Sequence, residues 1–214
     1  MTISVIDYGS GNLKSAAKAL EVAASNVGGN NTIVVTSDPK VIKKSDKIVL
    51  PGQGSFRDCY LGIKKIPGLD ETLNEFVLDR KKPILGICVG MQLFAKTGYE
   101  SKETKGFGWI DAEVRKINNM NKKLKLPHVG WNEIELIKTD CFLFSNIKNK
   151  SHMYFIHSYE FMTKKKDCVI ATTNYGNSII VSIVKDNIFG TQFHPEKSQK
   201  NGLIILENFL KWKL

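Results

Sequence analysis

The stretch that most constrains the fold is Pro83–Phe94, with the sequence PILGICVGMQLF. A short apolar run ends on Cys88, and Gly86 and Gly90 lie two residues to either side of it. This Gly-x-nucleophile-x-Gly spacing is typical of a sharp turn from a strand into a helix, where glycines remove steric clashes. We therefore predict a buried strand, a turn at Cys88 and a helix that starts with Met91–Phe94. Backbone N–H groups at such a helix start favour a thiolate, although a buried structural cysteine is the alternative.

The first half of the chain alternates strand and helix patterns. Strands are predicted at 3–7, 32–36 and 48–50, before the strand that ends on Cys88. Helices are predicted between them at 13–27, 38–44, 56–63 and 70–80. Alternation at this pace indicates βαβ units, and therefore an α/β fold with a parallel sheet and helices on both faces.

The second half of the chain is richer in strands. The pattern predicts them at 112–117, 131–137, 153–161, 169–173, 179–184 and 188–193, and a final helix at 199–211. Short turns join these strands, so we expect them to be antiparallel, to extend the sheet and to add a smaller one.

Composition limits the classes of protein that need to be considered. The chain has 214 residues, of which 42% are hydrophobic and 24% charged, as expected for a single globular domain over residues 1–214. No apolar run is long enough to cross a bilayer, and no signal-peptide pattern precedes the first strand, so we expect a cytoplasmic protein without a membrane partner. None of the four cysteines lies in a Cys-x-x-Cys or metal-like spacing: Cys59, Cys88, Cys141 and Cys168. We therefore expect reduced thiols and no metal or other cofactor.

The net charge of +10 raises the question of a nucleic-acid partner. The densest lysine runs, Lys122–Lys123 and Lys164–Lys166, lie in turn-like stretches without interleaved aromatic residues. This pattern favours a solvated surface over a nucleic-acid site, and it remains compatible with a partner or substrate rich in phosphate or carboxylate. The loop Tyr8–Asn12 lacks the glycine spacing of a nucleotide-binding loop.

A cysteine nucleophile needs a base and a group that orients the base, and the segment after residue 193 offers both. His194 follows the predicted strand 188–193, and Glu196 is two residues further on. Residues two apart in extended chain project to the same side, so the Glu196 carboxylate can hold the His194 imidazole, and Pro195 stiffens the pair. The remaining histidines have no carboxylate two residues away: His128, His152 and His157. No third metal ligand accompanies His194 and Glu196.

Two backbone amides are candidates for binding an oxyanion. The Val89 amide directly follows the nucleophile. The second amide is expected from the loop Pro51–Gly54, in particular from Gly52 and Gln53, because its glycines let the backbone approach a ligand closely. These residues alone would also suit a cysteine peptidase.

Two motifs together resemble a known family. The motif Gly86–Gln92 (GICVGMQ) is followed later in the chain by Phe193–Glu196 (FHPE). These two motifs, in the chain order Cys, His, Glu, resemble those of the class I, or triad-type, glutamine amidotransferases. Three further stretches resemble those of the glutaminase subunits of imidazole glycerol phosphate synthases: Asp7–Asn12, Pro127–Asn132 and Phe155–Tyr159. The resemblance covers nearly the whole chain. It departs at Gln53, where other members often carry a small apolar residue.

The resemblance implies a fold and an activity. The fold would be a flavodoxin-like three-layer sandwich with a mostly parallel central sheet, helices on both faces and an antiparallel extension. The activity would be hydrolysis of L-glutamine to glutamate and ammonia by Cys88, His194 and Glu196. The ammonia would be channelled to a (β/α)₈-barrel cyclase subunit in a heterodimer. That subunit would form imidazole glycerol phosphate and aminoimidazole carboxamide ribotide in histidine biosynthesis.

The resemblance also implies further site residues. Residues expected to contact glutamine are Gly54, Gln92, Glu100, Ser158 and Tyr159. Residues expected near the partner are Asn12, Trp131 and Lys197. The loop 51–54 would turn the Gln53 amide inward when the partner holds its ligand. Two alternatives share most of these residues, namely an ammonia-supplying subunit of a nucleotide-sugar amidotransferase and a catalytically silent interaction subunit.

Overall fold

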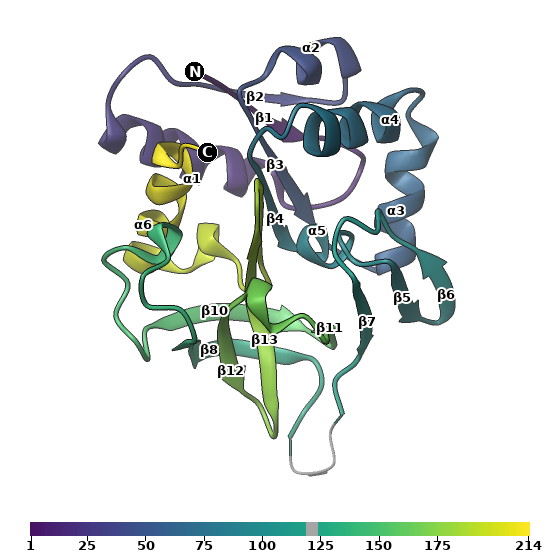
Figure 1. The fold of residues 1–214 in the computed structure, drawn as a ribbon, viewed down its shortest axis with the longest axis vertical. Coiled ribbons are helices and arrows are strands. Elements are labelled where there is room, and N and C mark those ends of the chain that lie inside the picture. Colours follow the sequence, from purple (N-terminus) through teal and green to yellow (C-terminus); the bar gives the residue numbers. More distant parts are fainter. Residues whose placement is uncertain (119–123) are drawn as a thin grey trace.

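The computed structural model describes residues 1–118 and 124–214, so the lysine run Lys122–Lys123 lies outside the described residues. Five strands form the parallel part of the main sheet (Figure 1). They are β1 (Thr2–Ile6), β2 (Thr32–Thr36), β3 (Lys47–Gly52), β4 (Ile84–Cys88) and β14 (Ile188–Thr191). Their order is β2-β1-β3-β4-β14, and each neighbouring pair is parallel, as in flavodoxin-like sheets.

An antiparallel extension continues the same sheet beyond β14. Its strands are β13 (Ser178–Lys185), β11 (Tyr159–Thr163), β7 (Ala112–Lys116), β5 (Thr97–Glu100), β6 (Lys102–Lys105), β12 (Val169–Asn174) and β9 (Glu135–Leu136). Within it only β5 and β7 pair in parallel among the described residues. Two other strands, β8 (His128–Glu133) and β10 (His152–His157), form a separate antiparallel sheet.

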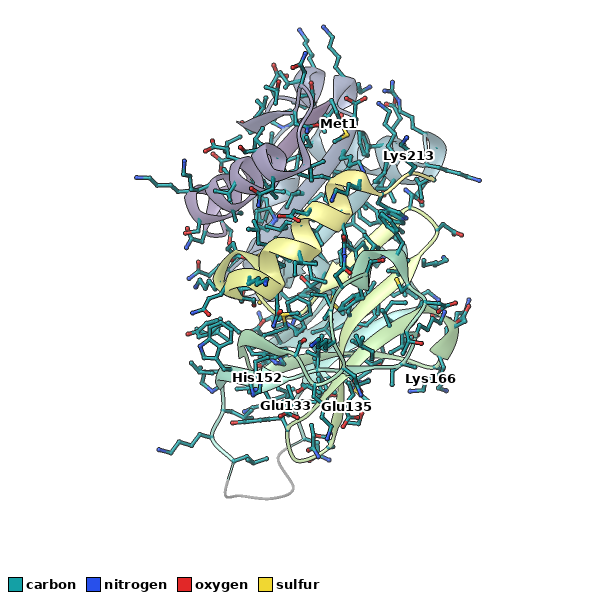
Figure 2. All side chains as sticks on the ribbon, turned by 90° about the vertical axis from the view of Figure 1, so that its left-hand side faces the viewer. Met1, Glu133, Glu135, His152, Lys166 and Lys213 are labelled. Atoms are coloured by element: carbon teal, nitrogen blue, oxygen red, sulfur yellow. The ribbon has the colours of Figure 1, made fainter. Side chains whose placement is uncertain are left out.

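Helices cover both faces of the parallel strands. On one face lie α1 (Leu13–Val27) and α6 (Gln199–Lys211), which pack side by side (Figure 2). On the other lie α3 (Phe56–Lys65), α4 (Leu69–Asn74), the π-helix η1 (Glu75–Asp79) and the short α5 (Val89–Gln92). Helix α2 (Pro39–Lys44) packs on α4, and the single-turn helices are η2 (Phe142–Phe144), η3 (Lys166–Cys168) and η4 (Pro195–Lys197). The predicted three-layer α/β fold is therefore confirmed.

The antiparallel strand predicted at 188–193 is β14, which has neighbours of both directions. β14 is antiparallel to β13, as its tight turn requires, but it also lies parallel to β4. After the turn that follows β13, β14 lies between β13 and β4. Because β4 belongs to the first half of the chain, local sequence carries no information about the pairing of β14 with β4.

Several element boundaries also differ from the predictions. The single strand predicted at 153–161 is two strands, β10 and β11, which belong to different sheets and separate at Ser158. The strand predicted at 131–137 is β8 followed by β9, and the helix predicted at 70–80 is α4 followed by η1. The hairpin β5–β6 was missed because its sequence is polar on both strands and resembles a loop.

A buried lysine ties the last helix to the sheet. Lys47, at the start of β3, donates from Nζ to the carbonyl oxygens of Phe209 (2.7 Å) and Trp212 (2.5 Å) at the end of α6. A cation near a helix C-terminus interacts favourably with the helix dipole. Burial lowers the pKa of Lys47 to about 8, against the opposing effect of Asp46.

Candidate active site

The ends of three parallel strands place the candidate residues at one edge of the sheet. Gly52, the last residue of β3, is in register with Cys88, the last residue of β4. On the other side of β4, Thr191 of β14 is in register with Ile87, and His194 follows three residues later. Carboxyl ends of parallel strands are where α/β sheets usually bind ligands.

The predicted sharp turn is present at Cys88. Its backbone has φ +55° and ψ −113°, a conformation unfavourable for a residue with a side chain, and α5 begins at the next residue. A Cβ added at Gly90 would overlap the carbonyl oxygen of Leu50, and one at Gly52 would overlap Gly90. Glycines at both positions therefore let α5 start directly against the end of β3.

His194 and Glu196 form a buried pair. The Nδ1 of His194 lies 2.8 Å from Oε1 of Glu196, and the two side chains are only 7% and 3% exposed. An ionised carboxylate only accepts hydrogen bonds, so Nδ1 is the donor. Nε2 of His194 and Oε2 of Glu196 are buried and find no hydrogen-bond partner among the described residues. The free Nε2 is therefore the atom available for proton transfer.

The charge state of His194 is set by its neighbours. Burial acts to lower the pKa of His194, but Cys88 and Glu196 outweigh burial and raise it to about 10. Although Cys88 has this electrostatic effect, its sulfur forms no hydrogen bond with Nε2. Sγ instead lies 3.8 Å from the Ile156 carbonyl oxygen and 3.6 Å from Nε2 of Gln192. The arrangement favours the imidazolium form of His194.

A cavity of about 320 Å³ opens beside Cys88. The predicted residues that line it are Gly52, Gln53, Gly54, Cys88, Val89, Gln92, Glu100, Ser158, Tyr159, His194 and Lys197. Glu196 is behind His194 and does not line it, and neither do Asn12 and Trp131. The fold thus gathers residues from both halves of the chain around one cavity.

Two of the expected glutamine contacts are engaged within the protein. Nε2 of Gln92 donates to the Tyr159 carbonyl oxygen (3.1 Å) and to Oε1 of Gln192 (2.9 Å), which leaves only the Gln92 Oε1 to accept from a substrate. Oε2 of Glu100 accepts from the Phe56 amide (2.8 Å) at the start of α3. Both side chains are therefore held in place at the cavity wall.

The loop 51–54 is held from outside the cavity. The Tyr8 hydroxyl donates to the Pro51 carbonyl oxygen at 2.5 Å. The Gln53 carbonyl oxygen accepts from the Ser10 hydroxyl and, at 3.4 Å, from the Cys59 thiol. Residues of the loop after β1 and of α3 thus fix the backbone that carries the proposed second oxyanion donor.

The three positions expected near a partner have different surroundings. Asn12 caps α1, since its side chain accepts from the Ser15 amide at 3.2 Å. Trp131, on β8, is 46% exposed, and its ring lies 5.9 Å from that of Tyr154 on β10. Nζ of Lys197 lies over the same Tyr154 ring, 5.8 Å from its centroid. Trp131 and Lys197 therefore share a surface next to the cavity, and Asn12 has a structural role of its own.

Sequence reasoning missed four residues at or beside the cavity. Pro127, Ile156 and His157 line it, and Gln192 contacts the Cys88 sulfur. All four lie inside or next to motifs that the sequence made prominent. Their residue types gave no signal of a role, because each depends on contacts between distant segments.

Two features are absent from the described residues. No group of three or more His, Cys, Asp and Glu side chains is placed to hold a metal ion in residues 1–118 and 124–214. Within the same ranges, none of the helices has the length and apolar character needed to cross a bilayer.

Comparison with known proteins identifies the family. The family model for glutamine amidotransferase class-I matches residues 4–212. The chain therefore belongs to the class I glutamine amidotransferases. Within that class it is 56% identical to the imidazole glycerol phosphate synthase subunit HisH of Pelagibacter ubique, over 98% of this chain and 99% of the relative. The HisH subunits of Agrobacterium fabrum and Mesorhizobium japonicum are 46% and 44% identical, with full coverage of both chains.

Solved structures share the fold at low sequence identity. A crystal structure of a glutamine amidotransferase superposes with a TM-score of 0.72 at 17% identity, over 98% of this chain and 97% of that one. The glutaminase domain of Trypanosoma brucei CTPS superposes with a TM-score of 0.68 at 16% identity, over 100% and 95%. The architecture is thus common to amidotransferases whose sequences have diverged widely.

Proposed function

We propose that this chain is the glutaminase subunit of an imidazole glycerol phosphate synthase. It hydrolyses L-glutamine and delivers the ammonia to a (β/α)₈-barrel cyclase subunit in histidine biosynthesis. The observation that carries the proposal is the cavity where Cys88 and the His194–Glu196 pair meet. The full-length similarity to HisH subunits favours this role over that of a nucleotide-sugar amidotransferase subunit.

In the first half of the reaction, the Cys88 thiolate attacks the side-chain amide carbon of glutamine. The amides of Val89 and Gln53 bind the oxyanion that forms, in the manner of oxyanion holes elsewhere. The His194 imidazolium gives its Nε2 proton to the departing nitrogen. The carbon–nitrogen bond then breaks, and ammonia and a thioester on Cys88 result.

In the second half, His194 has become neutral and its Nε2 accepts a proton from water. The hydroxide that forms attacks the thioester carbonyl, and collapse of the adduct expels the Cys88 thiolate and releases glutamate. Glu196 stays ionised throughout and keeps the His194 ring in the orientation that leaves Nε2 free. The imidazolium and thiolate are restored for the next turnover.

The surface beside the cavity supports a protein partner. Val129 and Trp131 of β8 pair with Ile156 and Tyr154 of β10, so the four side chains project to one face of this small sheet. Val129, Trp131 and Ile156 are 53%, 46% and 41% exposed, and Ile156 also lines the cavity. Exposed apolar residues that adjoin a site are typical of an interface. We propose that the cyclase subunit binds here.

The proposed function can be tested with the reconstituted complex. We expect the chain and the cyclase subunit from the same source to form imidazole glycerol phosphate with either glutamine or an ammonium salt. Cys88→Ala should abolish the glutamine-dependent reaction, because no thioester can form, and should leave the ammonia-dependent reaction intact. Glutamine-dependent turnover by Cys88→Ala would rule out this nucleophile.

A further inference from the structure

A buried carboxamide, Gln192, faces the sulfur of the proposed nucleophile. Gln192 directly follows β14, is fully buried, and its backbone amide donates to the Val181 carbonyl at 2.9 Å. Its Nε2 lies 3.6 Å from Sγ of Cys88. A carboxamide nitrogen can only donate, so the group presented to the sulfur is a hydrogen-bond donor.

The orientation of the Gln192 amide is determined by its neighbours. A backbone carbonyl can only accept, so the Gln92 side-chain atom at 3.1 Å from the Tyr159 oxygen must be its nitrogen. The same nitrogen donates to Gln192 at 2.9 Å, so that atom of Gln192 is its oxygen. The Gln192 nitrogen is left to face Cys88, and reversing either amide would place two donors or two acceptors against each other.

A second arm of hydrogen bonds holds the Tyr159 carbonyl itself. Nδ1 of His157 lies 2.9 Å from this oxygen, and Nε2 of His157 lies 3.0 Å from Nδ1 of His128. Nε2 of His128 in turn lies 3.2 Å from the Asn132 side-chain nitrogen. The series is consistent only if each ring donates at Nδ1 and accepts at Nε2, which is the neutral form.

The surroundings of the two histidines agree with this reading. Burial lowers the pKa values of His128 and His157 to about 4, so both rings are neutral at physiological pH. The His128 ring is also stacked between Phe155 and Tyr175, with centroid distances of 4.7 and 4.0 Å. The carbonyl that sets the direction of both glutamines is therefore rigidly fixed.

We propose that Gln192 is a positioning residue for the nucleophile, and that its amide N–H, aimed by Gln92 and the Tyr159 carbonyl, orients and stabilises the Cys88 thiolate. The inference rests on the proposed function in that it takes Cys88 as the nucleophile. Sγ also lies 3.8 Å from the Ile156 carbonyl oxygen, which can accept from a thiol but repels a thiolate. The Gln192 donor offsets that repulsion when the proton moves to His194.

The test replaces the donor and keeps the volume. Gln192→Met removes the amide, and Gln192→Asn withdraws it by one methylene. In the complex with the cyclase subunit, we expect kcat for glutamine to fall about tenfold in either variant, which corresponds to one hydrogen bond to a charged group. KM should change little, because Gln192 does not line the cavity and the Tyr159 carbonyl still holds Gln92. Alkylation of Cys88 by iodoacetamide, followed by mass spectrometry of its peptide, should slow by a similar factor without any glutamine present.

A matched control distinguishes a positioning role of Gln192 from a merely structural one. Asn208 on α6 is also buried, and its side-chain nitrogen donates to the carbonyls of Leu143 (3.1 Å) and Ser145 (2.9 Å). Asn208→Leu should lower the Tm yet leave kcat and Cys88 alkylation at the wild-type level. None of the variants replaces a titratable group near Sγ, and those groups include His194, Glu196, His157, Tyr8 and Cys59.

Two results would overturn the inference. One is that both Gln192 variants keep the wild-type kcat and the wild-type rate of Cys88 alkylation. The other is equal slowing in Asn208→Leu, which would make the effect one of general stability. If the wild-type complex releases no glutamate from glutamine, the proposed function fails instead. The alkylation arm needs no substrate and would still decide whether Gln192 acts on the sulfur.

Discussion

At the scale of single residues, the proposed chemistry of the site depends on a histidine whose charge is favoured despite its burial. A buried imidazole ordinarily loses its proton, as His128 and His157 do. The pKa of His194 moves the other way because Cys88 and Glu196 both lie against it. A general acid that is already protonated at neutral pH is what departure of ammonia requires.

Glu196→Gln is expected to reduce glutaminase kcat less than His194→Ala. An uncharged Gln side chain can still accept from Nδ1 and orient the ring, whereas His194→Ala removes the group that carries the proton. Steady-state assays of both variants in the complex provide the comparison. Equal losses would show that the charge of Glu196, and not only its position, is needed.

The same variant should change how stability depends on pH. A pKa raised from 6.5 to about 10 in the folded state stabilises the protein fully below pH 6.5, and this contribution is lost as pH rises through about 10. Glu196→Gln removes one of the groups that raise this pKa, so the contribution should be smaller and its loss should be complete at a lower pH than in the wild type. Urea unfolding of both proteins at a series of pH values from neutral to alkaline measures this dependence of the free energy of unfolding on pH.

At the scale of elements, the site exists because α5 begins in contact with the end of β3. The register brings Gly52 beside Cys88, and the next turn of chain passes Leu50 with no room for a side chain at residue 90. The strained backbone of Cys88 lies at this junction. Strain of this kind persists only where the surrounding structure determines it fully.

Gly90→Ala should therefore destabilise the protein severely. The added Cβ overlaps the Leu50 carbonyl oxygen, which belongs to a central strand. We therefore expect the free energy of unfolding to fall by more than about 3 kcal/mol, which is above the usual range for overpacking. Gly68→Ala is the control, because Gly68 has φ +76° and its nearest neighbour for a Cβ is 3.9 Å away. That change should lower the free energy of unfolding by only about 1 kcal/mol. Urea unfolding of both variants is the measurement, and similar losses would contradict the argument.

At the scale of the whole molecule, the small sheet β8–β10 carries the surface that adjoins the cavity. Its outer face carries the exposed apolar side chains of Val129, Trp131 and Ile156, with Glu133 and His152 at one end, while its inner face holds His128, Phe155 and Met153 in the interior. The two faces thus have separate roles. The inner face supports the cavity wall, and the outer face is free for the proposed partner.

Trp131→Ala should weaken binding of the cyclase subunit by at least roughly tenfold, since tryptophans often dominate interface energetics. The Tm of the isolated chain should change little, because 46% of the side chain is already exposed. Val35→Ala is the control. Val35 is 45% exposed, and it lies on β2, an edge strand of the main sheet that is distant from the small sheet β8–β10 (Figure 1). Titration calorimetry of both variants gives the Kd values. An unchanged Kd for Trp131→Ala would place the interface elsewhere.

Local sequence was sufficient for much of this description. The glycines around Cys88 predicted the sharp turn, because only that backbone needs them, and the alternation of patterns predicted the parallel half of the sheet. The spacing of His194 and Glu196 predicted that they would meet, and they do, although the chain between them is the single-turn helix η4 and not the extended chain that was expected. Each of these depends on neighbours in the chain.

Other features were decided only by tertiary structure. The insertion of β14 beside β4, the break at Ser158 and the alignment of Gln92 and Gln192 all join segments far apart in sequence. A carboxamide has no preferred partner of its own, so its direction follows from whichever carbonyl the fold places beside it. The sequence by itself thus determined which chemical groups are present and their local geometry. The packing of distant strands determined which of those groups face the sulfur, because hydrogen-bond direction depends on contacts that no local pattern encodes.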